Sequence, residues 1–412
     1  MSDPAGAAAA DVVVVGAGPA GVAAAIGLAR AGRDVLVVDK ARFPRDKCCG
    51  DGLTTGALRL LEHLGLDPAT VPSWQTVEDV TLRSPSGRQV HLPLPRDRGT
   101  YAAVARRTDL DAALVALARA AGAGVVEGAA VTGATAQAGR VDLRVDTLGT
   151  VSARYAVGAD GVWSPLRKAL GAGIPGYLGE WQAFRRYYHS VGPDAGRLHV
   201  WFEPDLLPGY AWSFPLAGGK ANVGFGVLRG TTGTGGLANL WPSLVGRPHV
   251  RAVLGPDATA EGPHKAWPIP ARVGAVRLAA AGGRALFVGD AAAAGDPMTG
   301  EGIGQALLSG VLAARAIAAA GPDDPDGAAR RYRADVHDEL GVDASVSGAL
   351  GRVLRRPWGA RGAVRVAGST DWSRRHFARW LFEDYPRAYL ATPSRWLRYS
   401  LVGDGAWAPP AP

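Results

Sequence analysis

Residues 11–21, DVVVVGAGPAG, decide the fold class. The apolar run at 11–15 is typical of a strand buried on both faces of a parallel sheet. Three glycines follow it: Gly16 permits a tight turn, Gly18 lets the backbone approach a pyrophosphate, and Gly21 lets the next helix pack closely against the strand. The helix-forming stretch VAAAIGLARAG and a second apolar strand, DVLVVDK, complete a βαβ unit. The stretch therefore predicts a Rossmann-type dinucleotide-binding domain.

An acidic residue ends the second strand of this unit. Asp39 stands 18 residues after Gly21, where a carboxylate accepts hydrogen bonds from ribose hydroxyls. We therefore expect a dinucleotide with a free 2′-OH, whose phosphates lie at the N-terminus of the intervening helix. A glycine-rich turn without a ligand is the alternative, but the flanking strand, helix and carboxylate favour the dinucleotide site.

The composition is that of a globular protein in a reducing environment. The chain has 412 residues, of which 47% are hydrophobic and 20% charged, enough to form a sizeable core. The two cysteines, Cys48 and Cys49, are neighbours and cannot form an unstrained disulfide. The N-terminus lacks the basic region of a signal peptide, and no run of about 18 uninterrupted apolar residues predicts a membrane span. We expect a cytoplasmic location.

Two β-rich stretches interrupt the dinucleotide-binding pattern. Residues 77–94 alternate around Ser86–Gly87 as in a hairpin, and 183–275 contain short β-type runs separated by Pro and Gly. The buried-strand pattern returns at 285–289, and helices dominate from about residue 302. The sequence thus predicts an α/β fold with a Rossmann-type binding domain, an inserted β-sheet substrate domain and a helical C-terminal region. The predicted boundaries are 1–75, 100–175 and 276–340 for the binding domain, 76–99 and 176–275 for the β domain, and 341–412 for the helical region.

Two further acidic turns follow apolar runs. Asp160, in ADGVWSPLR, comes after YAVG, and Gly289 and Asp290 come after RALFV and lead into DPMTGEGIG at 296–304. Taken singly, each is consistent with an ordinary acidic turn at a strand end. Their order and spacing after the GxGxxG motif are the informative feature.

This order of motifs resembles the flavoprotein superfamily of aromatic hydroxylases, geranylgeranyl reductases and flavin-dependent halogenases. The resemblance implies that FAD is the cofactor and that Asp290 bonds its ribityl chain. It also implies that the helix after 296–304 aims its N-terminus at the flavin pyrimidine, where a helix dipole favours the anionic reduced flavin. Arg107, in RTDLDAAL, matches the superfamily arginine near the phosphates and ribityl chain. A surface arginine at a helix start is its alternative interpretation.

Three stretches carry a finer resemblance to geranylgeranyl reductases, including the menaquinone side-chain reductases of actinobacteria. These stretches are FPRDKCCGDGL at 43–53, YAWSFP at 210–215 with Asn222 following, and DPMTGEGI at 296–303. Two positions depart from the family pattern: Cys48 replaces the usual proline, and Asp296 stands where asparagine is common. These departures bear on the substrate and outcome of the reaction.

The resemblance also assigns the expected site residues. Cys49, Tyr210 and Trp212 are expected to act at, or line, the cavity over the flavin. The alternatives are a small buried hydrophobe for the cysteine and one face of a core for the aromatic pair. The residues expected to bind FAD are Gly16, Gly18, Ala20, Gly21, Asp39, Lys40, Cys49, Gly50, Arg107, Asp160, Gly289, Asp290, Gly300, Gly302 and Ile303.

The function implied by the resemblance is reduction of carbon–carbon double bonds in an isoprenoid chain by reduced FAD. Aromatic hydroxylation on the same fold is the main alternative, followed by a non-catalytic flavin-binding protein or a halogenase, whose WxWxIP motif is matched at Trp212 but not at Tyr210. No second GxGxxG follows a strand, so the expected reductant is transiently bound NAD(P)H or a redox partner. No metal site is expected from the scattered histidines, and nothing predicts a nucleic-acid partner.

The positive charge gathers near the C-terminus. The net charge of the chain is +8, and residues 352–400 contain eleven arginines against Asp371, Glu383 and Asp384. Five of the twelve tryptophans lie beyond residue 350. Because a long apolar substrate resides in the bilayer, we expect peripheral contact of this region with the inner face of an anionic membrane. An ordinary helical subdomain with a solvated basic surface is the alternative.

Overall fold

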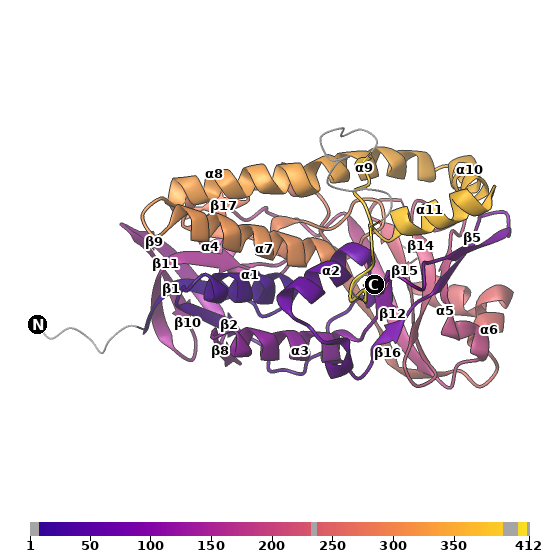
Figure 1. The fold of residues 1–412 in the computed structure, drawn as a ribbon, viewed down its shortest axis with the longest axis horizontal. Helices are drawn as coiled ribbons and strands as arrows, with labels where there is room; N and C mark the ends of the chain where they lie inside the picture. The colour runs from indigo at the N-terminus through magenta and orange to yellow at the C-terminus, as the bar shows by residue number, and fades with distance from the viewer. Residues whose placement is uncertain (1–7, 232–236, 390–402, 410–412) are drawn as a thin grey trace, which may run out of the picture.

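The computed structural model describes residues 8–231, 237–389 and 403–409. Figure 1 shows an elongated molecule with two sheets toward opposite ends and long helices packed along one side. The chain passes between the two sheets several times, so segments far apart in the sequence meet where the sheets face each other.

The first sheet is mostly parallel. Its strands are β1 (Ala8–Val15), β2 (Val35–Asp39), β8 (Gly124–Glu127), β9 (Val131–Gln137), β10 (Arg140–Val145), β11 (Gly149–Gly158), β17 (Ala279–Ala280) and β18 (Ala285–Phe287). The order β18–β11–β1–β2–β8 is parallel throughout, while β17 and the β9–β10 hairpin add antiparallel edges. The carboxyl ends of the central strands therefore meet at one edge, where open α/β sheets bind ligands.

The second sheet is mostly antiparallel. Its strands are β5 (Asp79–Arg83), β6 (Gln89–Pro93), β12 (Trp181–His189), β13 (Leu198–Trp201), β14 (Tyr210–Leu216), β15 (Lys220–Leu228) and β16 (Thr259–Ile269). They lie in the order β16–β12–β15–β14–β13–β5–β6, with only β13 and β5 parallel. A small third sheet joins β3 (Gly52–Leu53), β7 (Ala103–Val104) and β4 (Gln75–Thr76).

Helices cover both sheets. They are α1 (Pro19–Arg30), α2 (Thr55–Leu64), α3 (Arg107–Ala120), α4 (Pro165–Ala169), α5 (Leu237–Gly246), α6 (Pro248–Leu254), α7 (Ile303–Ala320), α8 (Pro325–Val336), α9 (Val342–Leu354), α10 (Pro357–Ala367) and α11 (Asp371–Leu381). A π-helical turn at His337–Gly341 joins α8 to α9. The strands expected at 11–16, 124–128 and 285–289 and the helix at 108–122 are observed as β1, β8, β18 and α3. The exact domain boundaries stay a prediction, because the connecting loops belong to neither sheet.

Helix α7 is central to the core. Its 18 residues have a mean hydropathy of 1.5, long and apolar enough to cross a membrane, although the interrupted apolar run in the sequence predicts no span. In the fold, 67% of this segment is buried, and it packs against α1, α2 and α8. A Cβ at Gly310 would overlap the carbonyl oxygen of Ala20, so this glycine permits the close approach of α7 and α1. We therefore interpret α7 as a core helix.

The C-terminal helices are tied back to the first part of the chain. The N–H of Thr55 at the start of α2 donates to the carbonyl of Phe382, just after α11. Arg59 of α2 forms an ion pair of 2.6 Å with Asp384. The region after α11 thus packs on the cofactor-binding half of the molecule, while α11 itself lies against β6.

Candidate FAD and substrate site

One cavity lies where the carboxyl ends of the parallel strands face the second sheet. Its volume is about 730 Å³, within the range of ligand and cofactor sites. The structure describes every site residue that was predicted from the sequence. All of them except Gly21 line this cavity. The predicted residues that line the cavity are Gly16, Gly18, Ala20, Asp39, Lys40, Cys49, Gly50, Arg107, Asp160, Tyr210, Trp212, Gly289, Asp290, Gly300, Gly302 and Ile303.

The three glycines of the first turn differ in what surrounds them. Gly16 has φ +104°, and a Cβ on it would overlap the backbone carbonyl of Ala159. A Cβ on Gly21 would overlap the backbone carbonyl of Gly16. Gly18 opens α1, and within the described part of the chain a Cβ there would approach only Nη2 of Arg45, at 3.7 Å. Gly16 and Gly21 are thus required by packing, whereas Gly18 leaves an open cradle at a helix N-terminus that fits the pyrophosphate of FAD.

The carboxylates at the strand ends hold the turns. Asp39 accepts the backbone N–H groups of Ala17 at 2.7 Å and Ala41 at 2.8 Å, one on each oxygen. Each oxygen keeps a second lone pair for a ribose hydroxyl. Asp160 accepts the N–H of Leu166 at 2.9 Å and the hydroxyl of Ser164 at 2.5 Å, so its carboxylate fixes the turn before α4.

Two arginines share one carboxylate beside the Gly18 cradle. Arg107 donates twice to Asp111, at 2.7 and 2.8 Å, and Nη1 of Arg45 lies 2.8 Å from the same carboxylate. The Arg107 side chain is buried, which is not the surface arginine of the alternative interpretation. Two guanidinium groups against one carboxylate leave an excess positive charge where the cofactor phosphates are expected.

The N-terminus of α7 reaches the cavity but is already capped. The N–H groups of Ile303 and Gly304 donate to Oε1 of Glu301, at 3.0 and 3.4 Å. Burial and the nearby charge of Glu383 raise the pKa of Glu301 to about 7. The resemblance implies that these N–H groups point at the flavin; here the Glu301 carboxylate accepts them, because buried N–H groups at a helix start need an acceptor.

The turn before α7 is held by the C-terminal region. Asp296 accepts the N–H groups of Met298 and Thr299 at 3.0 and 2.7 Å, and the hydroxyl of Ser347 from α9 at 2.7 Å. Nε of Arg387, whose side chain is 2% exposed, lies 3.3 Å from the same carboxylate. Burial opposes ionisation of Asp296, but Arg387 and these hydrogen bonds keep its pKa below the ordinary value. The aspartate that replaces the family's usual asparagine thus has its counter-charge in Arg387.

An aromatic wall forms the opposite side of the cavity. Tyr210, Trp212 and Phe214 alternate along β14, with ring centroids 5.9 and 5.8 Å apart. The Tyr210 hydroxyl donates to the carbonyl of Thr299 at 2.6 Å, and the Trp212 indole N–H donates to Asn222 at 3.1 Å. These aromatic residues face the cavity as expected for a site that holds an apolar substrate.

The two cysteines lie on the loop between β2 and β3. Burial raises the pKa of the Cys49 thiol to about 12 and that of Cys48 to about 11. The Cys48 thiol donates to the carbonyl of Lys265 at 3.4 Å, and Sγ of Cys49 accepts the N–H of Asp51 at 3.4 Å. Both residues are therefore thiols at neutral pH.

Several cavity residues were not predicted as site residues. They include Arg45, Lys47, Asp51, Glu301 and Trp267. Lys47 lies over the Trp267 ring, with Nζ 3.5 Å from the ring centroid, and burial lowers its pKa to about 8. The first four belong to the stretches 43–53 and 296–303, and their charged side chains within these motifs could have identified them as site residues. Trp267 belongs to no motif, and it reaches the cavity because β16 pairs with β12. Among the described residues, no three His, Cys, Asp or Glu side chains are placed to share a metal ion.

Comparisons with known proteins identify the family of the chain. Residues 9–195 match the family described as FAD binding domain. The chain is 37% identical to a menaquinone reductase of Mycolicibacterium smegmatis over 76% of this chain and 78% of the relative. It is 32% identical to digeranylgeranylglycerophospholipid reductase 2 of Methanopyrus kandleri over 80% of this chain and 83% of the relative.

A solved structure shares the fold across nearly the whole chain. The geranylgeranyl bacteriochlorophyll reductase-like protein of Thermoplasma acidophilum superposes with a TM-score of 0.79 at 21% identity, covering 96% of this chain and all of that protein. The glycine cradle, the paired arginines and the open cavity fit FAD, and the reductase relatives match most of the chain. The chain belongs to the geranylgeranyl reductase family of FAD-dependent oxidoreductases.

Proposed function

We propose that this protein reduces carbon–carbon double bonds in a long isoprenoid chain, with a prenylated quinone as the leading substrate class. The observation that carries the proposal is the single cavity that joins the FAD-binding edge of the parallel sheet to the aromatic wall of β14. An apolar chain lying on this wall would be next to the cofactor. The relatives named as menaquinone and digeranylgeranyl-lipid reductases support this class, since both substrates carry isoprenoid chains.

The protein residues have two tasks in such a reaction. Bound FAD, once reduced, supplies a hydride to one carbon of the double bond. Tyr210, Trp212 and Phe214 hold the chain by apolar contact, and the bond from Tyr210 to Thr299 keeps the wall in register with the turn before α7. The apolar surface of this wall also disfavours water next to the substrate chain. Aromatic hydroxylation is not favoured, because the relatives above are named as reductases.

The test is a single anaerobic turnover. Dithionite-reduced holoenzyme is mixed with menaquinone or with digeranylgeranyl glycerophospholipid, and the products are analysed by mass spectrometry. We expect a gain of two hydrogens per reduced bond in the side chain of the quinone, measured on side-chain fragments because reduction of the quinone ring also adds two hydrogens. A gain of one oxygen, appearing only when air is admitted, would instead identify a hydroxylase.

We further propose that the reductant is transiently bound NAD(P)H or a redox partner protein. The motif GxGxxG that follows a strand occurs once in the chain, at 16–21, and that turn is used for FAD. Rapid mixing of the oxidised holoenzyme with NADPH separates the two sources. Fast bleaching of the flavin by NADPH identifies the nucleotide as the reductant. A flavin that is bleached by dithionite but not by NADPH identifies a protein as the donor.

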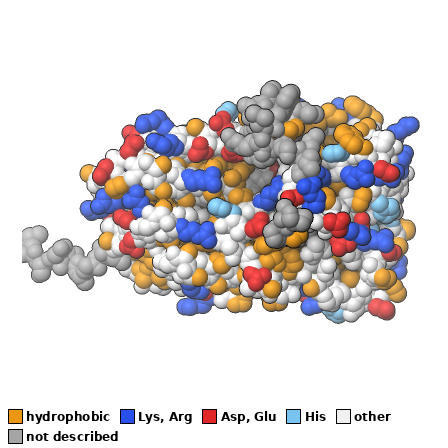
Figure 2. All heavy atoms as spheres, in the orientation of Figure 1, with side chains coloured by type: hydrophobic (Ala, Val, Ile, Leu, Met, Phe, Trp, Pro, Cys, Tyr) orange, Lys and Arg blue, Asp and Glu red, His pale blue; other side chains and the backbone are white. Residues whose placement is uncertain are grey.

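The end of the molecule formed by α10 and α11 is proposed to contact an anionic lipid bilayer. Trp358, Val366 and Trp372 are 68%, 66% and 63% exposed, and Figure 2 shows hydrophobic and basic side chains next to each other over this end. Arg361 and Arg365 follow Trp358 at helical spacing, and both are exposed. Interfacial tryptophans with arginines, each contributing about 1 kcal/mol near anionic lipid, support reversible binding.

Sedimentation with vesicles tests this surface. The protein should bind vesicles that contain phosphatidylglycerol at low salt and leave them at high salt, and the double variant Trp358→Ser/Trp372→Ser should bind more weakly. Leu178→Ser, at an exposed residue outside α10 and α11, is the matched control. Binding that ignores lipid charge and the tryptophans would refute the membrane contact. Arg395, Trp396 and Arg398 lie outside the described residues.

A further inference from the structure

A buried carboxyl group faces the cavity from the loop that carries the cysteines. Asp51 is fully buried, lines the cavity and has a φ of +66°. Its neighbours in the loop, Gly50 and Gly52, lie against the aromatic wall: a Cβ on either would be 3.1 to 3.6 Å from the ring atoms of Trp212 or Phe214. Asp51 is therefore on the side of the cavity where the substrate chain is expected.

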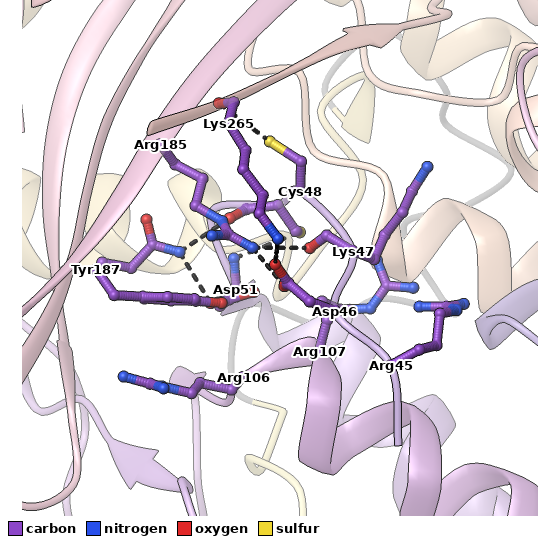
Figure 3. Close-up of polar contacts among 12 residues, drawn as sticks. Arg45, Asp46, Lys47, Cys48, Asp51, Arg106, Arg107, Arg185, Tyr187 and Lys265 are labelled. Atoms are coloured by element: carbon purple, nitrogen blue, oxygen red, sulfur yellow. Dashed lines mark hydrogen bonds and ion pairs between the residues drawn. The ribbon is translucent and has the colours of Figure 1, made fainter. Parts of the chain in front are cut away.

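The two oxygens of Asp51 are in different environments. Oδ2 accepts the phenol of Tyr187 at 2.7 Å and the amide of Asn222 at 2.8 Å (Figure 3). Tyr187 and Asn222 are cross-strand partners on β12 and β15, so the second sheet presents both donors together. Oδ1 is buried and has no hydrogen-bond partner among the described residues. Because two donors already occupy Oδ2, a proton on this carboxyl group belongs on Oδ1, the buried oxygen that has no partner among the described residues.

Charged groups are placed to favour the carboxylate once the proton has left. The guanidinium groups of Arg106 and Arg185 each lie 4.2 Å from the centroid of the Tyr187 ring, one on either side (Figure 3). Arg185 is also paired with Asp46, and Arg106 with Glu261. The titratable and charged groups that act on Asp51 are Tyr187 and Arg185 of β12, Arg107 of α3, and Cys48 and Cys49 of its own loop. Burial raises the pKa of Asp51 to about 6, despite the hydrogen bonds that favour its ionised form.

We propose that Asp51 is the acid that protonates the substrate double bond, with Tyr187 and Asn222 as positioning residues that stabilise the carboxylate left behind. This inference rests on the proposed reductase function and names the source of its proton. Reduction adds a hydride, from reduced FAD, to one alkene carbon and a proton to the other. The O–H bond of Asp51 breaks as the new C–H bond forms, and water restores the proton after the product leaves.

Other acids in the cavity suit this task less well. The thiol of Cys49, with a pKa of about 12, and the ammonium of Lys47, with a pKa of about 8, are weaker acids. The carboxyl group of Glu301 has a pKa of about 7, and its Oε1 accepts two N–H groups at the start of α7, where the helix dipole favours the ionised carboxylate over the acid. An alkene is a poor base, so a stronger acid is favoured.

The test compares Asp51→Asn with the wild-type holoenzyme. Asparagine tolerates a positive φ and can still accept from Tyr187 and Asn222, so FAD content and flavin reduction by dithionite should be unchanged. The anaerobic rate at which the side chain of a prenylated quinone gains two hydrogens, followed by mass spectrometry of side-chain fragments, should fall about 100-fold or more. In the wild type this rate should be high at low pH and fall as pH rises through about 6, because only the protonated acid is active; Asp51→Asn should lose this dependence. Asp97→Asn, on an exposed loop, is the matched control.

A conservative variant and a spectroscopic measurement complete the test. Tyr187→Phe removes a hydrogen bond to the carboxylate, which should raise the pKa of Asp51 and move the pH dependence of the rate to higher pH. Infrared difference spectra should show a protonated carboxyl band that is lost near pH 6 and is absent in Asp51→Asn. Full turnover in Asp51→Asn, or loss of the pH dependence only in Glu301→Gln, overturns the assignment. A wild-type protein that reduces no double bond overturns the proposed function and this inference together.

Discussion

The glycine-rich turn at 16–21 and the loop at 43–53 both line the cavity, but different parts of the chain hold them in place. The turn is held by backbone packing, since Gly21 lies against the carbonyl group of Gly16, and Gly16 lies against the carbonyl group of Ala159, just after β11. The loop is held by side chains from distant segments: Asp46 pairs with Arg185 and Lys265, and Asp51 accepts from Tyr187. Both segments are recognisable in the sequence, but only the backbone constraints of the turn can be derived from its own residues, whereas the partners of the loop's side chains lie in distant segments.

The largest expected effect comes from the packed glycine of the turn. In Gly21→Ala, the new Cβ would overlap the carbonyl of Gly16, which cannot move because it is backbone. We expect a loss of more than about 4 kcal/mol of stability, or no folded protein at all. Circular dichroism and thermal unfolding measure this. Gly196→Ala, where nothing described lies within 4 Å of the added Cβ, should unfold like the wild type.

The second-largest effect on stability is expected from a side chain that is distant in the sequence from the turn it holds. Arg387→Ala would leave Asp296 and Glu383 buried with no guanidinium partner, which costs about 3–5 kcal/mol for buried pairs of this kind. FAD affinity should fall as well, because Asp296 holds the turn before α7. Chemical denaturation and equilibrium dialysis of FAD provide the two measurements. If Arg387→Ala were as stable as the wild type, the C-terminal region would have no role in holding this turn.

Gly18→Ala should separate stability from cofactor binding. The nearest described atom to the added Cβ is Nη2 of Arg45, at 3.7 Å, so stability should change by less than about 1 kcal/mol. The methyl group would occupy the cradle of the pyrophosphate, and the protein should be purified folded but nearly colourless. Absorbance at the flavin band per chain, with thermal unfolding of the apoprotein, gives the answer. Full FAD content in this variant would contradict the assignment of the cradle.

The smallest effects are expected at the cysteines. Cys49→Ala should keep FAD but change turnover or the number of bonds reduced several-fold, while Cys48→Ala should be nearly silent. Because burial raises both pKa values to about 11–12, alkylation by iodoacetamide should be slow at pH 7 and accelerate only in strongly alkaline solution. Product distributions and alkylation rates check both statements. Identical products from the two variants would return Cys49 to the role of a buried hydrophobe.

The sequence predicted the fold class and most of the cofactor-binding edge. Gly16, Asp39, Asp160 and Asp290 stand at strand ends, and parallel strands bring their carboxyl ends to one edge whatever the loops do. The family resemblance added the aromatic residues of β14, which lie on the cavity wall as expected. Local patterns such as these survive in the sequence because each depends on neighbours within one βαβ unit or one strand.

Tertiary structure alone decided the proton-bearing and charged part of the site. Asp51 faces Tyr187, 136 residues away, and Asn222, 171 residues away, so no spacing rule links the three. Arg387 reaches Asp296 across the helical region. Burial determines which of these groups keeps its proton, and burial depends on how β12, β15 and the C-terminal helices pack over the loop. The sequence predicted which residues line the proposed FAD site, and the packing of distant strands and helices determined which carboxyl groups lie in the cavity with them.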